Sequence, residues 1–186
     1  MPESPDGAGG LTRAKRAVWE SVEEYLRDHH VMTLSTFGSI VPGGTAVPHA
    51  ATVFYAFRRG DGGGEWGSRE GIELIFAGKA DSRHGRHLAA AGAKGAPAAA
   101  AVSEHYSLWR DVRGVQLWGR AFMLFGVPRV AALAVYLVRF PFVAELLKNA
   151  RGHHLPATIA LFSLQVERAA YTDNSTGVFG RSEVAL

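Results

Sequence analysis

The stretch FAGKADSRH, residues 76–84, joins the end of an apolar segment to the start of a predicted helix. The apolar run over residues 72–77 predicts a strand, and the pattern over residues 82–91 predicts a helix with Asp81 or Ser82 as its N-cap. A chain that passes from a strand through a glycine turn into a helix presents unpaired backbone amides at that corner. This turn between a strand and a helix therefore fixes two neighbouring elements from which the rest of the fold can be predicted.

The same corner has the chemistry of a phosphate site. The helix dipole and the free amides favour negative charge there. Lys79, Arg83 and Arg86 could add cationic contacts, and so could His84 when it is protonated. On spacing alone the pattern also fits a capped helix with a solvated basic face, so both interpretations stay open.

The residues on either side predict the order helix, three strands, helix, two strands, helix pair, strand. The predicted helices cover residues 11–29, 82–91 and 127–147, the last of them with a break at Phe140-Pro141. The predicted strands cover residues 31–36, 50–57, 72–77, 98–103, 115–125 and 158–167. Successive strands joined by hairpin-like links predict an α+β, mainly-β fold built on an antiparallel barrel.

The composition is typical of one globular domain. Of the 186 residues, 47% are hydrophobic and 20% are charged, which leaves room for a sizeable core. We expect a disordered tail over residues 1–10 and a single domain over residues 11–186. No apolar run approaches the roughly 18 residues of a membrane span, and the first ten residues do not resemble a secretory signal. This predicts a cytoplasmic protein with no membrane partner.

Several function classes lose support from the sequence. The absence of cysteine excludes disulfides, thiolate zinc sites and cysteine nucleophiles, and a net charge of +3 is too small to favour nucleic acid. His84 and His87 are three residues apart, but no third ligand follows at a recognisable spacing, so no metal site is predicted. No hydrolase or phosphate-loop motif is found, and the catalytic residues stay unknown. The aromatic residues around positions 106–125 fit a wall for a planar cofactor, an ordinary core or a dimer interface.

Further stretches occur in a consistent order along the chain, namely RGVQLWGRA at 113–121, RFPFVA at 139–144, YTDN at 171–174 and GVFG at 177–180. Together with residues 75–77 and 82–84 they resemble the pyridoxamine-phosphate-oxidase-like FMN-binding split barrels, and within them the YhbP-like bacterial group. The resemblance spans about residues 12 to 181. It implies a six-stranded antiparallel split β-barrel with flanking helices, and a homodimer with two FMN molecules at its interface.

The resemblance also implies which residues hold the cofactor. The backbone of His49, Ala50, Ala51 and Thr52 would flank the flavin ring, with Phe76 and Ala77 at its other edge; Ser82, Arg83 and His84 would hold the phosphate beside Lys79, and Gln116 and Trp118 would approach from the partner chain. His84 stands where the family has a lysine, and no arginine stands near His49. The arginine and histidine signature of true pyridoxamine phosphate oxidases is missing from residues 171–186, so we do not expect vitamin B6 oxidation.

The expected function is that of an FMN-dependent oxidoreductase acting on a small or nicotinamide substrate, with the chemistry supplied by the flavin. The first alternative is a non-catalytic module of the same fold that binds haem or another planar ligand, with His49 or His84 as a contact. A barrel that binds single-stranded nucleic acid is a weaker alternative because the excess of positive charge is small.

Overall fold

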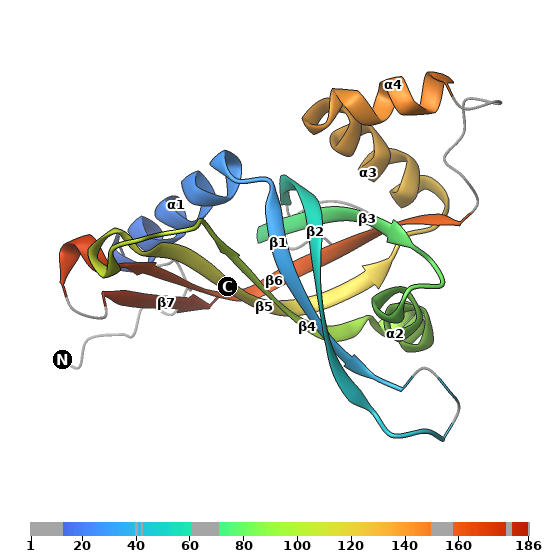
Figure 1. The fold of residues 1–186 in the computed structure, drawn as a ribbon, viewed down its shortest axis with the longest axis horizontal. Helices are drawn as coiled ribbons and strands as arrows, with labels where there is room; N and C mark the ends of the chain where they lie inside the picture. Colours follow the sequence, from blue (N-terminus) through green and yellow to red (C-terminus); the bar gives the residue numbers. More distant parts are fainter. Residues whose placement is uncertain are drawn as a thin grey trace, which may run out of the picture.

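The computed structural model describes residues 13–39, 41, 43–60, 71–149, 158–177 and 180–185. The tail expected over residues 1–10 lies outside the described residues. The described residues form one curved, seven-stranded sheet with helices at its sides and ends (Figure 1). The expected mainly-β fold is confirmed.

The strands pair in the order β3-β2-β1-β4-β5-β6-β7, and an additional pairing between β3 and β6 closes the first six into a ring. Every pairing is antiparallel. The strands are β1 (Val31–Gly38), β2 (Val47–Gly60), β3 (Gly71–Lys79), β4 (Ala96–Ser103), β5 (Arg113–Met123), β6 (Ile159–Asp173) and β7 (Arg181–Ala185).

The strand count differs from the expected six because β7 adds a seventh strand to the end of β6. Its sequence, RSEVA, is short and polar and has a single buried residue, Val184. The apolar periodicity of β6 weakens after residue 166, although the strand continues to Asp173. Pairing with β5 and β7 holds this polar half of β6 in the sheet, which local pattern does not predict.

The helices lie close to their expected positions. They are α1 (Arg13–Asp28), α2 (Arg83–Ala91), α3 (Gly126–Arg139) and α4 (Pro141–Asn149), with short 3-10 turns η1 (Gly92–Lys94), η2 (Trp109–Asp111) and η3 (Asn174–Thr176). The expected break at Phe140-Pro141 is confirmed, since α3 ends before it and α4 begins with the proline. In Figure 1, α1 and α2 lie at opposite ends of the curved sheet.

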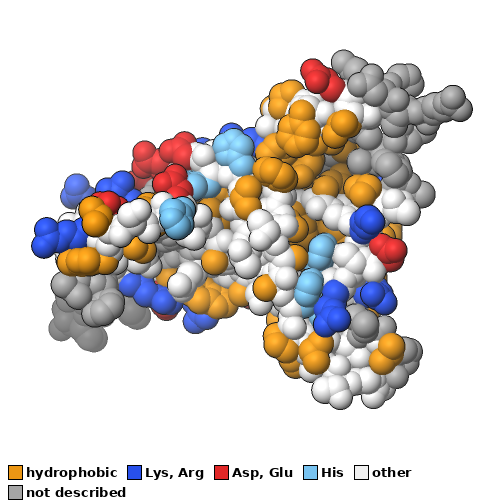
Figure 2. Space-filling view, in the orientation of Figure 1, with side chains coloured by type: hydrophobic (Ala, Val, Ile, Leu, Met, Phe, Trp, Pro, Cys, Tyr) orange, Lys and Arg blue, Asp and Glu red, His pale blue; other side chains and the backbone are white. Residues whose placement is uncertain are grey.

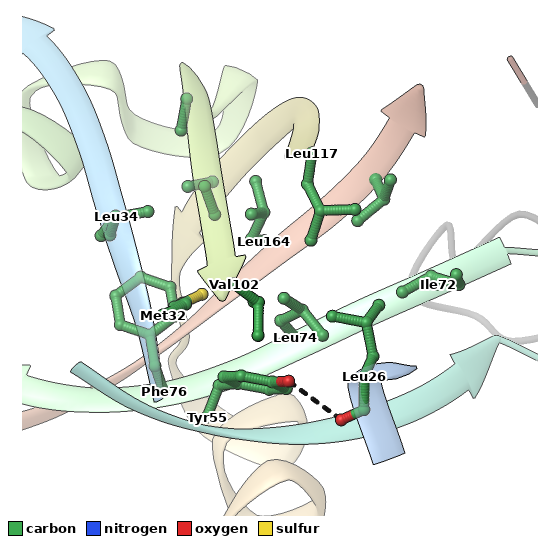
Figure 3. Close-up of a cluster of buried hydrophobic side chains, with 14 of the residues drawn as sticks. Leu26, Met32, Leu34, Tyr55, Ile72, Leu74, Phe76, Val102, Leu117 and Leu164 are labelled. Carbon is green, nitrogen blue, oxygen red and sulfur yellow. Dashed lines mark hydrogen bonds between the residues drawn. The ribbon is translucent and has the colours of Figure 1, made fainter. Parts of the chain in front are cut away.

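The core fills the inside of the ring (Figure 3). Its side chains come from every strand of the ring and from α1, and they include Leu26, Met32, Leu34, Tyr55, Leu74, Phe76, Val102, Leu117 and Leu164. The buried hydroxyl of Tyr55 donates to the carbonyl of Leu26 at 2.9 Å. This hydrogen bond ties the end of α1 to β2 and satisfies a polar group that burial would otherwise leave unpaired.

Gly119 marks an irregularity in the ladder between β5 and β6, where the register shifts after Trp118. A Cβ atom at Gly119 would lie 1.8 Å from the carbonyl oxygen of Gln165. The backbones of β5 and β6 therefore approach too closely at this position for any residue but glycine.

No helix in the described part of the chain is both long enough and apolar enough to cross a membrane.

Candidate functional site

The ring opens where β2 and β3 separate. The two strands pair from Gly60 back to Tyr55, which lies opposite Phe76. Beyond this point β2 continues to Val47 paired with β1, and β3 continues to Lys79 paired with β6. Within the described residues no strand pairs with the outer edge of β2 over residues 47–53. We call the region between these two diverging strand edges, which is defined by the strand pairing, the slot.

The edges of the slot carry backbone hydrogen-bonding groups. The amide of Tyr55 donates to His30 on the β1 side, and successive residues of a strand alternate in the direction of their N–H and C=O groups. Ala50 and Thr52 therefore direct both groups to the open edge. On the other strand the amide of Ala80 faces β6, so the amide of Lys79 faces the slot. Backbone N–H and C=O groups on these edges need hydrogen-bond partners when a ligand or other atoms cover them.

The start of α2 lies directly after the β3 edge of the slot. Ser82 is its N-cap, accepting from the amide of Gly85 at 3.2 Å and donating to the carbonyl of Lys79 at 2.7 Å. Arg83 and Lys79 are exposed. The structure thus brings three of the predicted phosphate residues together at a helix start, with the serine hydroxyl engaged in capping.

His84 lies on the inner side of the helix, away from solvent. It is 8% exposed, its Nε2 lies 3.1 Å from Ser82 Oγ, and its ring contacts those of Phe76 and Phe162. A Cβ atom at Gly78 would lie 2.6 Å from Nε2, so the imidazole packs against bare backbone. Burial and the neighbouring imidazoles lower the pKa of His84. A neutral His84 is therefore a weaker phosphate contact than the lysine that the resemblance implies at this position.

His87 was not predicted as a site residue, yet it belongs to the same cluster. It is 3% exposed, and its Nδ1 lies 3.0 Å from Oγ1 of the buried Thr36 on β1. Burial, His49 and the nearby arginines lower its pKa. The signal for it in the sequence was its position one helical turn after His84.

His49 completes this group from β2. Its ring is half-buried, and its centroid lies 6.1 Å from that of His84 and 6.3 Å from that of His87. Figure 2 shows histidine side chains next to lysine and arginine side chains on the face that carries α2. No group of three metal-binding side chains close enough to hold a metal ion occurs in the described residues.

Gln116 and Trp118 lie on the outer face of the sheet, away from the slot. The strand registers align Thr52, Thr33, Ala101 and Gln116 in one row, and Ala50, Ser35, Ala99 and Trp118 in the next. Three strand spacings separate the two ends of each row, which is about 14 Å. Within one chain these two residues therefore do not reach a ligand at the edge of β2.

A separate pocket of about 520 Å³ lies between α3 and β2 and is lined by Phe57, Ala134, Val135, Val138 and Arg139. None of the predicted site residues lines it. It is a mainly apolar concavity, and the guanidinium of Arg139 in its lining already donates to the carbonyls of Arg27 and His29, so the slot beside α2 remains the candidate site.

The sequence matches no protein-family model and no curated protein sequence. Solved structures do share its architecture. A heme binding protein from Mycobacterium smegmatis superimposes with a TM-score of 0.58 at 18% identity, covering 96% of this chain and 60% of that chain. A protein from Clostridium acetobutylicum related to general stress protein 26, of the pyridoxinephosphate oxidase family, superimposes with a TM-score of 0.56 at 11% identity, covering 92% and 96%.

The chain has the fold of the pyridoxine-phosphate-oxidase-like split barrels. A FAD-binding protein from Mesorhizobium loti shares it with a TM-score of 0.54 at 13% identity, covering 89% of this chain and 93% of that chain. This split barrel spans 60% of the length of the mycobacterial heme binding protein. The narrower resemblance to the YhbP-like group stays a prediction.

Proposed function

We propose that this split barrel binds a planar, phosphate-bearing cofactor, FMN, in the slot between β2 and β3, and that it is a flavin-dependent oxidoreductase for a small or nicotinamide substrate. The observation that carries the proposal is the separation of β2 from β3 directly beside the start of α2. A flat ring system needs hydrogen-bonding groups along its edge, and its phosphate needs positive charge at one end. The backbone groups on the edge of β2 and the positive charge at the start of α2 lie together at the slot.

The residues at the slot fit FMN. The backbone groups of Ala50 and Thr52 can pair with polar edge atoms of the ring, and Ala77 lies where β3 parts from β2. Arg83, Lys79 and the amides of the first turn of α2 can hold the phosphate. Bound flavin would supply hydride and electron transfer, while the protein supplies binding, orientation and electrostatics.

A homodimer would complete the site. Gln116 and Trp118 share an outer sheet face with Ala50 and Thr52 but lie three strands away from them. Across a two-fold axis, the same two residues of a second copy could meet the slot. The side chains between them are Thr33, Ser35, Ala99 and Ala101, which are small enough to let a second sheet approach closely.

Haem is the second candidate ligand, and His49 is the observation that favours it. Its imidazole is half-buried at the mouth of the slot, whereas His84 and His87 are enclosed. An accessible imidazole is a common haem ligand. The mycobacterial protein of the same fold is a heme binding protein.

Titration of the purified protein with FMN, riboflavin and hemin separates these functions. We expect FMN to bind more tightly than riboflavin by roughly tenfold to a hundredfold, because riboflavin lacks the phosphate that makes charge-assisted hydrogen bonds. Arg83→Ala should remove most of this difference and leave riboflavin binding unchanged. Arg16→Ala, an exposed arginine on α1 at the other end of the molecule, is the matched control.

Equal affinity for FMN and riboflavin would contradict the phosphate site. Tight hemin binding with a Soret band that His49→Ala abolishes would favour the haem function instead. For the oxidoreductase activity, the loaded protein should lose its flavin absorbance under anaerobic conditions when NADH or NADPH is added. If the flavin stays oxidised with both donors, the protein binds flavin but lacks this oxidoreductase activity.

A further inference from the structure

Three imidazoles gather where α2 packs against β1 and β2, beside the slot. His84 and His87 extend from α2, and His49 extends from β2 between them, at ring-centroid distances of 6.1 and 6.3 Å. The two helix residues pack against glycines of the sheet, His84 on Gly78 of β3 and His87 on Gly38 of β1. This close fit fixes both rings in place directly behind the start of α2.

Among the residues that the structure describes, each of the two enclosed imidazoles has one nitrogen without a partner. Nε2 of His84 lies against Ser82 and Nδ1 of His87 lies against Thr36. The other nitrogens, Nδ1 of His84 and Nε2 of His87, are buried and have no hydrogen-bond partner in the described residues. Polar atoms in such surroundings ordinarily find a partner. These two rings therefore have unused capacity to hold a proton.

Burial is the main reason why that capacity is unused in the ligand-free protein, and the charged groups around the rings add to it. His49 from β2 acts on both rings, and Arg83 and Arg86 from α2 act on His87, all of them disfavouring a further positive charge. The other groups packed against His84 are Phe76 of β3, Phe162 of β6 and Ser82, none of which is ionised. The nearest carboxylate in sequence, Asp81, is exposed in the preceding turn.

We propose that a dianion bound at the start of α2 is accompanied by proton uptake on the His84 and His87 pair, so that an anionic group that keeps both its charges binds more tightly as the pH falls. The location of the anion rests on the proposed function. The reason for the coupling is electrostatic. A dianion beside Ser82 and Arg83 offsets the positive potential at both rings, and charges behind a buried surface are weakly screened. By linkage, whatever favours the proton then favours the anion equally.

The ligand-free protein should show the opposite effect of acid. Burial and neighbouring positive charge place the pKa of both rings below that of an unfolded histidine. The unfolded chain therefore binds more protons below a pH of about 6.5, and the free energy of unfolding falls as the pH is lowered through and below that value. A bound anion should reduce this loss.

Sulfate is the probe, because it keeps its double negative charge throughout the range in which histidine titrates. Isothermal titration at constant ionic strength, at about pH 8 and about pH 5.5, gives the affinity. We expect sulfate to bind roughly threefold to tenfold more tightly at the lower pH, as the uptake of a fraction of a proton requires. Repeating the titration at intermediate pH in buffers of different ionisation enthalpy measures the protons directly.

His84→Gln and His87→Gln should each reduce the pH dependence, and His105→Gln, an exposed loop histidine, should leave it unchanged. Circular dichroism checks that each variant is folded. If either variant does not fold, the buffer dependence of the heat in the wild-type protein still gives the proton count.

Sulfate binding that depends on Arg83 but takes up no proton, with equal affinity at both pH values, would overturn the coupling and leave the FMN site intact. Failure of sulfate and FMN to bind at any pH would overturn the site itself. The two results are distinguishable because the first retains the effect of Arg83→Ala on affinity.

Discussion

At the scale of single residues, Ser82 has to serve two purposes. Its hydroxyl caps α2 through Gly85 and closes the turn through Lys79. The same residue lies where the phosphate is expected. A variant that keeps the cap while repelling an anion would separate these two roles.

Ser82→Asp is such a variant, because aspartate is as good an N-cap as serine and its negative charge suits the helix start. We expect the free energy of unfolding to stay within about 1 kcal/mol of the wild type. FMN affinity should fall at least tenfold while riboflavin affinity is unchanged, since only the phosphate meets the new carboxylate. Chemical denaturation and fluorescence titration measure the two effects.

Ser82→Ala is the control, with a loss of about 1 kcal/mol of stability from the missing cap. An unchanged FMN affinity in Ser82→Asp would mean that the phosphate does not approach this helix start.

At the scale of elements, an ion pair with a third partner joins the paired half of β2 to β3 and β6. Arg58 on β2 donates from Nε to Glu73 Oε2 at 2.7 Å, and Ser163 on β6 donates to Glu73 Oε1 at 2.5 Å. The carboxylate is buried, at 6% exposure, while the side chain of Arg58 is 34% exposed. This group holds the strands together three residue pairs before β2 and β3 separate.

Arg58→Ala would leave the carboxylate of Glu73 buried without its counter-ion, which costs about 2 to 4 kcal/mol. Urea denaturation should show this loss. The neighbouring Arg59→Ala should cost less than about 1 kcal/mol, because Arg59 is 71% exposed and its pairing with Glu23 is at 3.6 Å. Equal effects of the two substitutions would mean that the buried carboxylate finds another partner or a proton.

Most elements could be predicted from the sequence because their patterns are local. The cap at Ser82, the break at Phe140-Pro141 and the glycine at the irregularity in β5 each have one physical cause that a sequence displays. The slot has no such local cause. Residues 50–57 lie within one continuous strand, β2. The point at which β2 separates from β3 depends on the pairing of β2 with β1 and of β3 with β6. The cluster around His84 likewise depends on which side of α2 faces the ring.

At the scale of the whole molecule, the outer sheet face decides whether the site is complete in one chain. Thr33, Thr52 and Ala101 lie exposed in a row that ends at Gln116. If two copies meet there, a large charge on this face should separate them without affecting the core.

Ala101→Glu places that charge on an exposed residue of β4. We expect the wild type to sediment as a dimer and the variant as a folded monomer, because desolvating a carboxylate at a sheet interface is costly. FMN affinity should fall together with dimerisation. Ala89→Glu, at an exposed position on α2, is the control for the added charge. A monomeric wild type that binds FMN fully would contradict the shared site.

The central claim is that the slot between β2 and β3, ending at the start of α2, holds a flat ligand by its phosphate. A crystal structure of the protein with FMN tests it most directly. We predict the phosphate within hydrogen-bonding distance, about 3 Å, of the Arg83 guanidinium and the first amides of α2, with the ring along Ala50 and Thr52. FMN bound elsewhere, for example in the pocket beside α3, with Arg83 facing solvent, would contradict the account.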